Sequence, residues 1–194
     1  MTEVYFVRHA QSDHCVLDNR TRPLTEEGLR DSKAVTWVLA DKKIDFLISS
    51  PYKRSMDTIN DLAAELGLPI HKDEDFRERR IGNLHGEEIL EFAEKQWEDF
   101  DYKTEDGESL REVQTRNIRA LNRVLSEHSS EKIVVGTHGM ALSTFLNYYY
   151  SEFDFVCFMK ILDFMPFVIR MDFDGEKCVG SQVELVIRKE YKAV

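Results

Sequence analysis

The 194-residue sequence has little proline, glycine and cysteine, and it has no long hydrophobic run. Its four prolines and nine glycines are scattered, so they form no linker, and we find no internal repeat. A chain of this length with 42% hydrophobic residues can bury one sizeable core, and we expect residues 1–194 to form a single domain. The three cysteines lack metal-type spacing, and their odd number favours a reducing compartment over a disulfide framework.

The sequence also lacks an excess of positive charge. Its formal net charge is −10, whereas proteins that bind nucleic acid or anionic membranes concentrate Lys and Arg. The most apolar stretch, residues 153–171, is interrupted by four charged residues and is a poor membrane span. The first residues do not resemble a signal peptide. We therefore expect a soluble, cytoplasmic protein without nucleic-acid or membrane partners, and its oligomeric state stays open.

Three short apolar runs end directly on polar residues. They cover residues 4–7, 44–48 and 133–135. Such runs are typical of strands that are buried on both faces of a largely parallel sheet. Helical stripes of apolar residues lie between them, at residues 59–66 and 110–125. The pattern predicts an α/β fold, with a mostly parallel central sheet and helices on both faces.

Local signals predict where two of these elements begin and end. Ser50 is a candidate N-cap for the helix that contains residues 59–66, and Pro51 suits its first position. Gly67 is a candidate C-terminal residue of the same helix. The Asp174-Gly175 pair predicts a hairpin near the C-terminus.

The polar residues that follow the three runs are the candidate site. Active sites of open parallel sheets lie beyond the carboxyl ends of the strands. If the three strands are neighbours, their ends bring six residues to one rim: Arg8, His9, Ser49, Ser50, Thr137 and His138.

These residue types suit a phosphoryl group. A neutral imidazole such as that of His9 is a nucleophile toward phosphorus, and the guanidinium of Arg8 matches phosphate oxygens. Arg54 lies in the first turn of a predicted helix, where backbone amides already favour an anion. His138 stands between two glycines at a strand end. Taken singly, each residue is equally consistent with a surface or structural role.

Glu78 is the candidate proton donor. It lies in a Gly-punctuated segment, residues 76–86, together with Arg77, Arg79 and Arg80. A carboxyl group there can protonate a leaving alkoxide and later accept a proton from water. Neighbouring arginines favour the ionised form of a carboxyl group, which opposes the role of an acid. A solvated salt-bridge patch is the alternative interpretation.

Several segments in order resemble the histidine phosphatase superfamily, which contains the cofactor-dependent phosphoglycerate mutases and many small phosphatases. The matching segments are residues 7–10 (VRHA), 22–28 (RPLTEEG), 49–58 (SSPYKRSMDT), 76–86, 107–109 (GES) and 136–139 (GTHG). The resemblance implies a phosphoglycerate mutase-like fold with a short helical insertion around residues 83–108, over the active site. It identifies the chain as similar to the small phosphatase branch.

The resemblance also implies roles for individual residues. His9 forms a phosphohistidine, Arg8, Arg54 and His138 hold the phosphoryl group, and Glu78 is the proton donor. No metal or organic cofactor is implied. The implied reaction is hydrolysis of small phosphomonoesters, as in histidine-type acid phosphatases, with a small phosphorylated metabolite as substrate. Ala10, Gln11 and Cys15 depart from the usual pattern, and it stays open whether Gln11 and Cys15 contact the phosphate.

Three other functions compete with a phosphatase. Mutases of this family usually carry a longer, basic insertion, whereas residues 87–108 are few and acidic. Protein phosphohistidine phosphatases of the Arg-His-Ala form generally lack the acid-bearing segment, whereas this chain keeps Glu78. A binding module without catalysis has no need of both His9 and Glu78. The acidic stretch further predicts a compact substrate with few negative charges beyond its phosphate.

Overall fold

The computed structural model describes residues 1–84 and 86–189, so His85, within the predicted acid-bearing segment, lies outside the described residues. The strands are β1 (Thr2–Arg8), β2 (Phe46–Ser49), β3 (Ile70–Lys72), β4 (Lys132–Thr137), β5 (Phe164–Asp174) and β6 (Lys177–Arg188). The helices are α1 (Glu26–Leu39), α2 (Lys53–Leu66), α3 (Glu88–Glu98), α4 (Leu110–Glu127), α5 (Gly139–Tyr149) and α6 (Phe155–Ile161), with short 3-10 turns η1 (Ala40–Lys42) and η2 (Glu74–Phe76).

The six strands form one sheet in the order β3-β2-β4-β1-β5-β6. β1 to β4 pair in parallel, and β5 and β6 add an antiparallel edge. The three predicted strands are therefore neighbours in the centre of the sheet, as the site prediction required. The predicted hairpin is also confirmed, since β5 and β6 are joined at Gly175, which has a positive φ of 60°.

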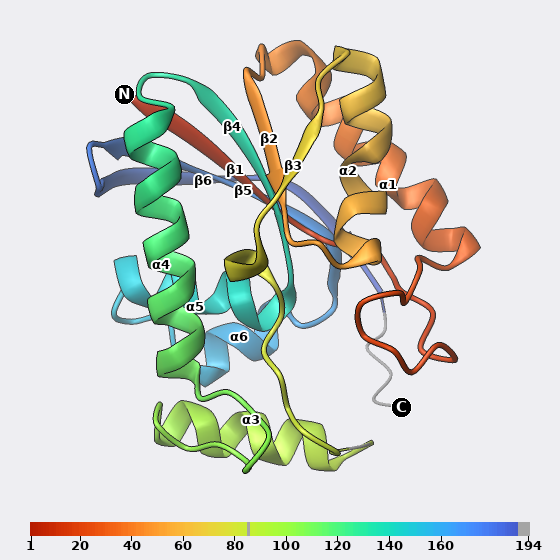
Figure 1. The fold of residues 1–194 in the computed structure, drawn as a ribbon, viewed down its shortest axis with the longest axis vertical. Coiled ribbons are helices and arrows are strands. Elements are labelled where there is room, and N and C mark those ends of the chain that lie inside the picture. The colour runs from red at the N-terminus through yellow and green to blue at the C-terminus, as the bar shows by residue number, and fades with distance from the viewer. Residues whose placement is uncertain (85, 190–194) are drawn as a thin grey trace.

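Both faces of the central strands are buried, which explains their continuous apolar sequences. Val4 and Phe6 of β1 pack on the side of α4 and α5, while Tyr5 and Val7 pack on the side of α1 and α2. Figure 1 shows these two helix layers on either side of the sheet. The predicted α/β class with helices on both faces is confirmed.

The predicted start of α2 is wrong. The helix begins at Lys53 with Tyr52 at its N-cap, and it ends at Gly67 as predicted, with a left-handed φ of 65°. Ser50 cannot act as the cap because its backbone N–H still donates to Gly136 of β4, at 2.9 Å. The chain therefore needs two further residues to turn from the sheet into the helix.

α3 and α6 lie at the end of the molecule where β1, β2 and β4 end (Figure 1). They pack around a third, smaller apolar cluster that includes Ala93 of α3, Met140 of α5 and Phe158 of α6. α3 falls within residues 83–108, the stretch predicted to form a helical insertion. None of the helices in the described part of the chain combines the length and apolar character needed to cross a membrane.

Candidate active site

The carboxyl ends of β1, β2 and β4 border a cavity of about 260 Å³. Its polar lining residues are Arg8, His9, Ser12, His14, Asn19, Arg22, Arg54, Glu78 and Arg79. Four of the five predicted site residues thus line one cavity. The fifth, His138, lies directly behind His9, with the two ring centroids 5.2 Å apart. Residues that are far apart in the sequence meet here because parallel strands end on the same edge of the sheet.

His9 continues the pairing of β1 beyond its last residue, since its backbone N–H donates to the carbonyl of Thr137 at 3.1 Å. Its ring Nδ1 lies 2.7 Å from the carbonyl oxygen of Ala10. A carbonyl accepts only, so Nδ1 carries the proton and Nε2 presents its lone pair. Burial, together with Arg54 and Arg8, holds the pKa of His9 well below its usual value of 6.5. The ring is therefore a neutral base with Nε2 available.

Two buried arginines flank this imidazole. Arg54 donates from Nε to Nε2 of His9 at 3.2 Å, and from Nη1 to the carbonyl of Asn19 at 2.7 Å. Burial lowers the pKa of Arg54 to about 10, so it stays charged at neutral pH. Arg8 donates to the carbonyl of Ile161 at 2.7 Å, and its guanidinium lies so close to Gly139 that a Cβ there would come within 3.1 Å of Arg8 Cζ. Backbone groups thus fix both cations beside the nucleophile candidate.

His138 is fully buried, and its Nε2 lies 2.8 Å from the hydroxyl of Ser50. The same hydroxyl accepts the backbone N–H of Tyr52 at 3.3 Å, so its own proton is free to point at His138. The other ring nitrogen of His138, Nδ1, is a buried atom without a hydrogen-bond partner among residues 1–84 and 86–189. Burial and the charge of Arg54 hold the pKa of His138 well below 6.5, so the ring is neutral in the unliganded protein.

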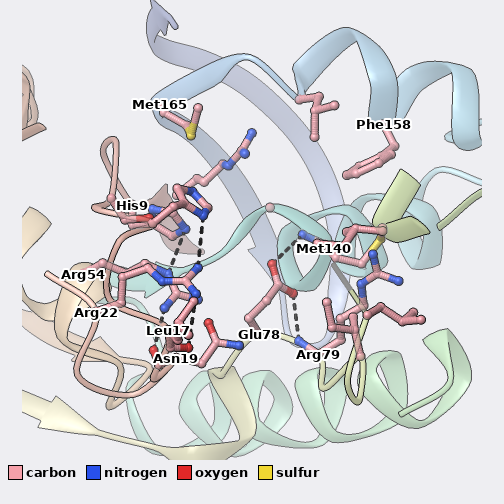
Figure 2. Close-up of a pocket in the computed structure, with 18 of the residues that line it drawn as sticks. His9, Leu17, Asn19, Arg22, Arg54, Glu78, Arg79, Met140, Phe158 and Met165 are labelled. Atoms are coloured by element: carbon pink, nitrogen blue, oxygen red, sulfur yellow. Dashed lines mark hydrogen bonds between the residues drawn. The ribbon is translucent and has the colours of Figure 1, made fainter. Parts of the chain in front are cut away.

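Glu78 faces the cavity from the segment that precedes α3, with its carboxylate close to the start of α5 (Figure 2). Oε2 accepts the N–H of Met140 at 3.0 Å, and Oε1 accepts the N–H groups of Ala141 and Arg79 at 3.1 and 2.8 Å. The amides at the start of α5 therefore hold this carboxylate in position. The Arg79 guanidinium donates to Gln96 rather than to Glu78.

The sequence analysis missed an ion pair that supports the acid-bearing segment. Glu108, only 5% exposed, accepts from Arg77 at 2.5 Å and from Arg116 of α4 at 3.1 Å. Arg116 also donates to the backbone carbonyls of Asp75 at 2.6 Å and Glu78 at 3.3 Å. A buried arginine binds several carbonyls at once because its fork carries five donors. Glu108 and Arg116 thus anchor the chain that presents Glu78.

The loop after β1 contributes a further cation and a histidine. Arg22 lines the cavity and donates to the carbonyl of Val16 at 2.9 Å, and its Nη1 lies 3.4 Å from Nδ1 of His14. His14 lines the same cavity, and the sequence analysis did not identify it as a site residue. Cys15 is exposed, and neither Cys15 nor Gln11 belongs to the described residues that line the cavity.

The cavity lining does not include three other basic residues, Arg20, His71 and His128. Arg20 forms an exposed ion pair with Glu74 at 2.5 Å. His71 is exposed, and His128 stacks on Phe46 with ring centroids 3.8 Å apart. Among the described residues, no three His, Cys, Asp or Glu side chains gather in a way that could hold a metal ion.

A comparison with known protein families identifies the family to which this fold and this set of site residues belong. The sequence profile of the histidine phosphatase superfamily (branch 1) matches residues 4–155. The chain belongs to the histidine phosphatase superfamily. The family assignment and the phosphatase class predicted from the ordered motifs are confirmed.

Similar proteins include phosphatases and proteins named as mutases. The uncharacterized phosphatase PhoE of Bacillus subtilis is 30% identical over 150 residues, which cover 75% of this chain and 76% of that protein. The phosphoglycerate mutase-like protein 4 of Arabidopsis thaliana is 30% identical over 152 residues, which cover 71% of this chain and 66% of the plant protein.

Solved structures share the fold over nearly the whole chain. YhfR of Bacillus stearothermophilus is 23% identical with a TM-score of 0.75, covering 92% of this chain and 94% of that one. The phosphoserine phosphatase of Entamoeba histolytica in complex with 3-phosphoglyceric acid is 20% identical with a TM-score of 0.78, covering 96% of this histidine phosphatase and 98% of that chain. These likenesses confirm the fold.

Proposed function

We propose that this histidine phosphatase hydrolyses small phosphomonoesters through a phosphohistidine on His9. The observation that carries the proposal is the hydrogen bond from His9 Nδ1 to the Ala10 carbonyl, which leaves Nε2 unprotonated beside Arg54 and Arg8. A neutral nitrogen fixed next to two cations suits attack on a phosphoryl group, since such transfer depends mainly on positioning and charge neutralisation.

In the first step, His9 Nε2 attacks phosphorus, and the bond from phosphorus to the ester oxygen breaks. Arg8, Arg54 and His138 stabilise the equatorial phosphoryl oxygens. A bound phosphate displaces the Arg54 Nε–H from His9, because the guanidinium then donates to a phosphate oxygen instead. Glu78 is protonated in the reacting form; held by three backbone N–H groups, it donates the proton that the leaving oxygen requires.

In the second step, water attacks the phosphohistidine, and the bond between phosphorus and Nε2 breaks. Glu78 accepts the proton of this water, which restores its starting state, and inorganic phosphate leaves. The same carboxyl group thus serves as acid and then as base, as a reaction with two successive displacements at one phosphorus requires.

A mutase is the second candidate, because relatives at 30% and 31% identity carry that name. A mutase must hold a substrate with a second charged group. α3, which follows the cavity-lining segment, instead carries four glutamates and one lysine. A protein phosphohistidine phosphatase would not require Glu78, since phosphohistidine is already a good leaving group. Both points favour a phosphatase for esters.

The test is His9→Ala, assayed with nitrophenyl phosphate and with alkyl phosphates. We expect turnover to fall by about 10⁴-fold or more, since loss of a nucleophile removes the covalent route, while the melting temperature changes little. His71→Ala is the matched control, because it removes an exposed imidazole far from the cavity. Rapid-quench trapping of an acid-labile phosphoenzyme in the wild type, absent from His9→Ala, identifies the intermediate. Near-normal activity in His9→Ala would refute the covalent mechanism.

We further propose that residues 1–194 form a single domain in which the stretch around residues 83–108 is an insertion over the active site. Leu84 and Ile89, which line the cavity from this stretch, support the proposal. A cytoplasmic location fits the three free cysteines. Limited proteolysis that yields one protected core, cut first within residues 83–108, is the expected result.

A further inference from the structure

The cavity has two chemically different ends. His9, Arg22 and Arg54 lie at one end, and Glu78 lies between this end and the side chains of Phe158 and Met140 (Figure 2). The lining beyond Glu78 is apolar, beginning with the buried Met140 and Phe158. Apart from Leu17, the other apolar lining residues of the cavity are the buried Leu162 and Met165 and the half-buried Ile81, Leu84 and Ile89. A proton donor at the boundary marks where the ester oxygen lies, so the apolar end receives the organic group of the ester.

The charges around the apolar end oppose a second anion. α3 begins at Glu88, beside the lining residue Ile89, and carries four glutamates and one lysine. Its negative field repels a carboxylate that enters this end of the cavity.

Apart from Arg8, whose guanidinium packs against Gly139, Arg79 is the cation that lines the cavity near Met140 in the described part of the chain (Figure 2). Arg79 is 6% exposed, and its guanidinium donates to Gln96 and lies 5.3 Å from the centre of the Phe92 ring. These contacts hold it within the protein. A substrate carboxylate would have to compete with them, and its burial without a dedicated partner is costly.

We infer that the preferred substrates are phosphomonoesters of a small, uncharged and predominantly apolar alcohol or phenol, whose carbon skeleton packs against Phe158 and Ile89. The inference rests on the proposed function, and it narrows the substrate class of that same site. The cavity volume of about 260 Å³ lies just below the usual range for small-molecule sites, so the organic group is short. This class differs from phosphoserine and 3-phosphoglyceric acid, the carboxylate-bearing ligands named for the Entamoeba structures.

The first experiment measures kcat/KM for ethyl, propyl, butyl and pentyl phosphate. These esters have similar leaving groups, so their differences report contact with the carbon chain. Each buried methylene is expected to raise kcat/KM about fourfold until the apolar end is filled. Benzyl phosphate is then compared with 4-carboxybenzyl phosphate, which adds one distant anion, and we expect a preference of at least about tenfold for benzyl phosphate.

The second experiment places a cation at the apolar end with Ile89→Lys. Ile89 is half-buried at the second position of α3, where lysine is compatible with a helix. The preference for benzyl over 4-carboxybenzyl phosphate should shrink by about tenfold or reverse. Leu84→Lys is the second variant if the melting temperature of Ile89→Lys falls. Val156→Lys, an exposed position of α6 outside the cavity, is the matched control and should keep the wild-type preference.

A binding measurement separates this inference from the proposed function. The same esters are titrated into the His9→Ala protein by calorimetry, where no turnover occurs. Tighter binding of butyl than of ethyl phosphate, and of benzyl than of 4-carboxybenzyl phosphate, supports the apolar subsite even if no ester is hydrolysed. Equal binding across the alkyl series, or tighter binding of the carboxylated ester, overturns it even if hydrolysis depends on His9.

Discussion

The two ends of the cavity are built in different ways. At the polar end, His9, Arg8, Arg54 and Glu78 each make a hydrogen bond to a backbone group, which belongs to the loop after β1, to the end of α6 or to the start of α5. At the apolar end, the lining side chains come from α5, α6, β5, the start of α3 and the segment before it, and their apolar contacts have no fixed direction.

This difference separates the two tasks of the site. Directed bonds to the backbone fix atoms to within a fraction of an ångström, which the transfer of a phosphoryl group requires. Apolar contacts tolerate changes of shape and volume, so a helix or loop can vary and accept another organic group. Substitutions at the polar end should therefore slow all esters together, and substitutions at the apolar end should change their ranking.

Of the substitutions that test this rule, Glu78→Gln has the largest expected effect. It should also be an exception to the rule. A glutamine cannot release a proton, so hydrolysis of alkyl phosphates should fall by about 10²- to 10⁴-fold. Nitrophenyl phosphate should lose much less, because nitrophenolate leaves without protonation. A polar-end residue would then change the ranking of esters through the chemistry of the leaving group rather than through its shape.

A stability measurement, a control variant and a rapid quench test whether the loss comes from proton transfer by Glu78. The amide group of a glutamine would face the N–H of Met140, so the melting temperature must show that the loss is not one of folding. Glu87→Gln, an exposed carboxyl in the same segment, is the control and should retain full activity. If Glu78 mainly activates the water, both esters slow alike and the phosphoenzyme accumulates in a rapid quench. Equal losses without accumulation show that Glu78 is not the acid.

Ser50→Ala should produce a smaller loss that is the same for every ester. Its hydroxyl orients His138, and one hydrogen bond contributes about 1 kcal/mol, which corresponds to roughly a fivefold decrease in kcat/KM. Ser49→Ala is the matched control, because that buried hydroxyl contacts Ser55 rather than His138. A change in the ranking of alkyl phosphates in Ser50→Ala would contradict the separation of the two ends.

The last prediction concerns stability at acid pH rather than activity. Burial holds the pKa values of His9 and His138 below 6.5 in the folded chain, so the unfolded chain binds more protons as the pH falls below about 6.5. Each ring therefore lowers the free energy of unfolding by up to about 1.4 kcal/mol per pH unit on acidification, until its folded form is protonated.

Urea unfolding at a series of pH values checks this prediction. His9→Ala should show a shallower decrease in the free energy of unfolding between pH 6.5 and 5 than the wild type, because one of the two rings is gone. Ile89→Lys, at the apolar end, should keep the wild-type slope. Identical slopes in all three proteins would mean that these rings are not neutral in the fold.

Much of the site was accessible from the sequence because it is carried by local patterns. Each of Arg8, His9 and His138 follows a run of apolar residues that could only be a buried strand, and Arg54 lies near the start of a periodic helix. Buried parallel strands share one carboxyl edge, so these residues had to meet. The misplaced start of α2 arose because Ser50 still pairs with Gly136 of β4, a residue distant in the sequence.

The amino-acid sequence by itself determined the α/β class, the polar residues that follow the three central strands and the chemical groups of the site. These follow from apolar periodicity and ordered motifs. Only the tertiary structure decided the tautomer of His9, the carboxylate contacts of Glu78 and its support by Glu108 and Arg116. It also decided that the cavity has an apolar end. These features depend on hydrogen bonds and contacts between residues distant in sequence, whose geometry no local pattern encodes.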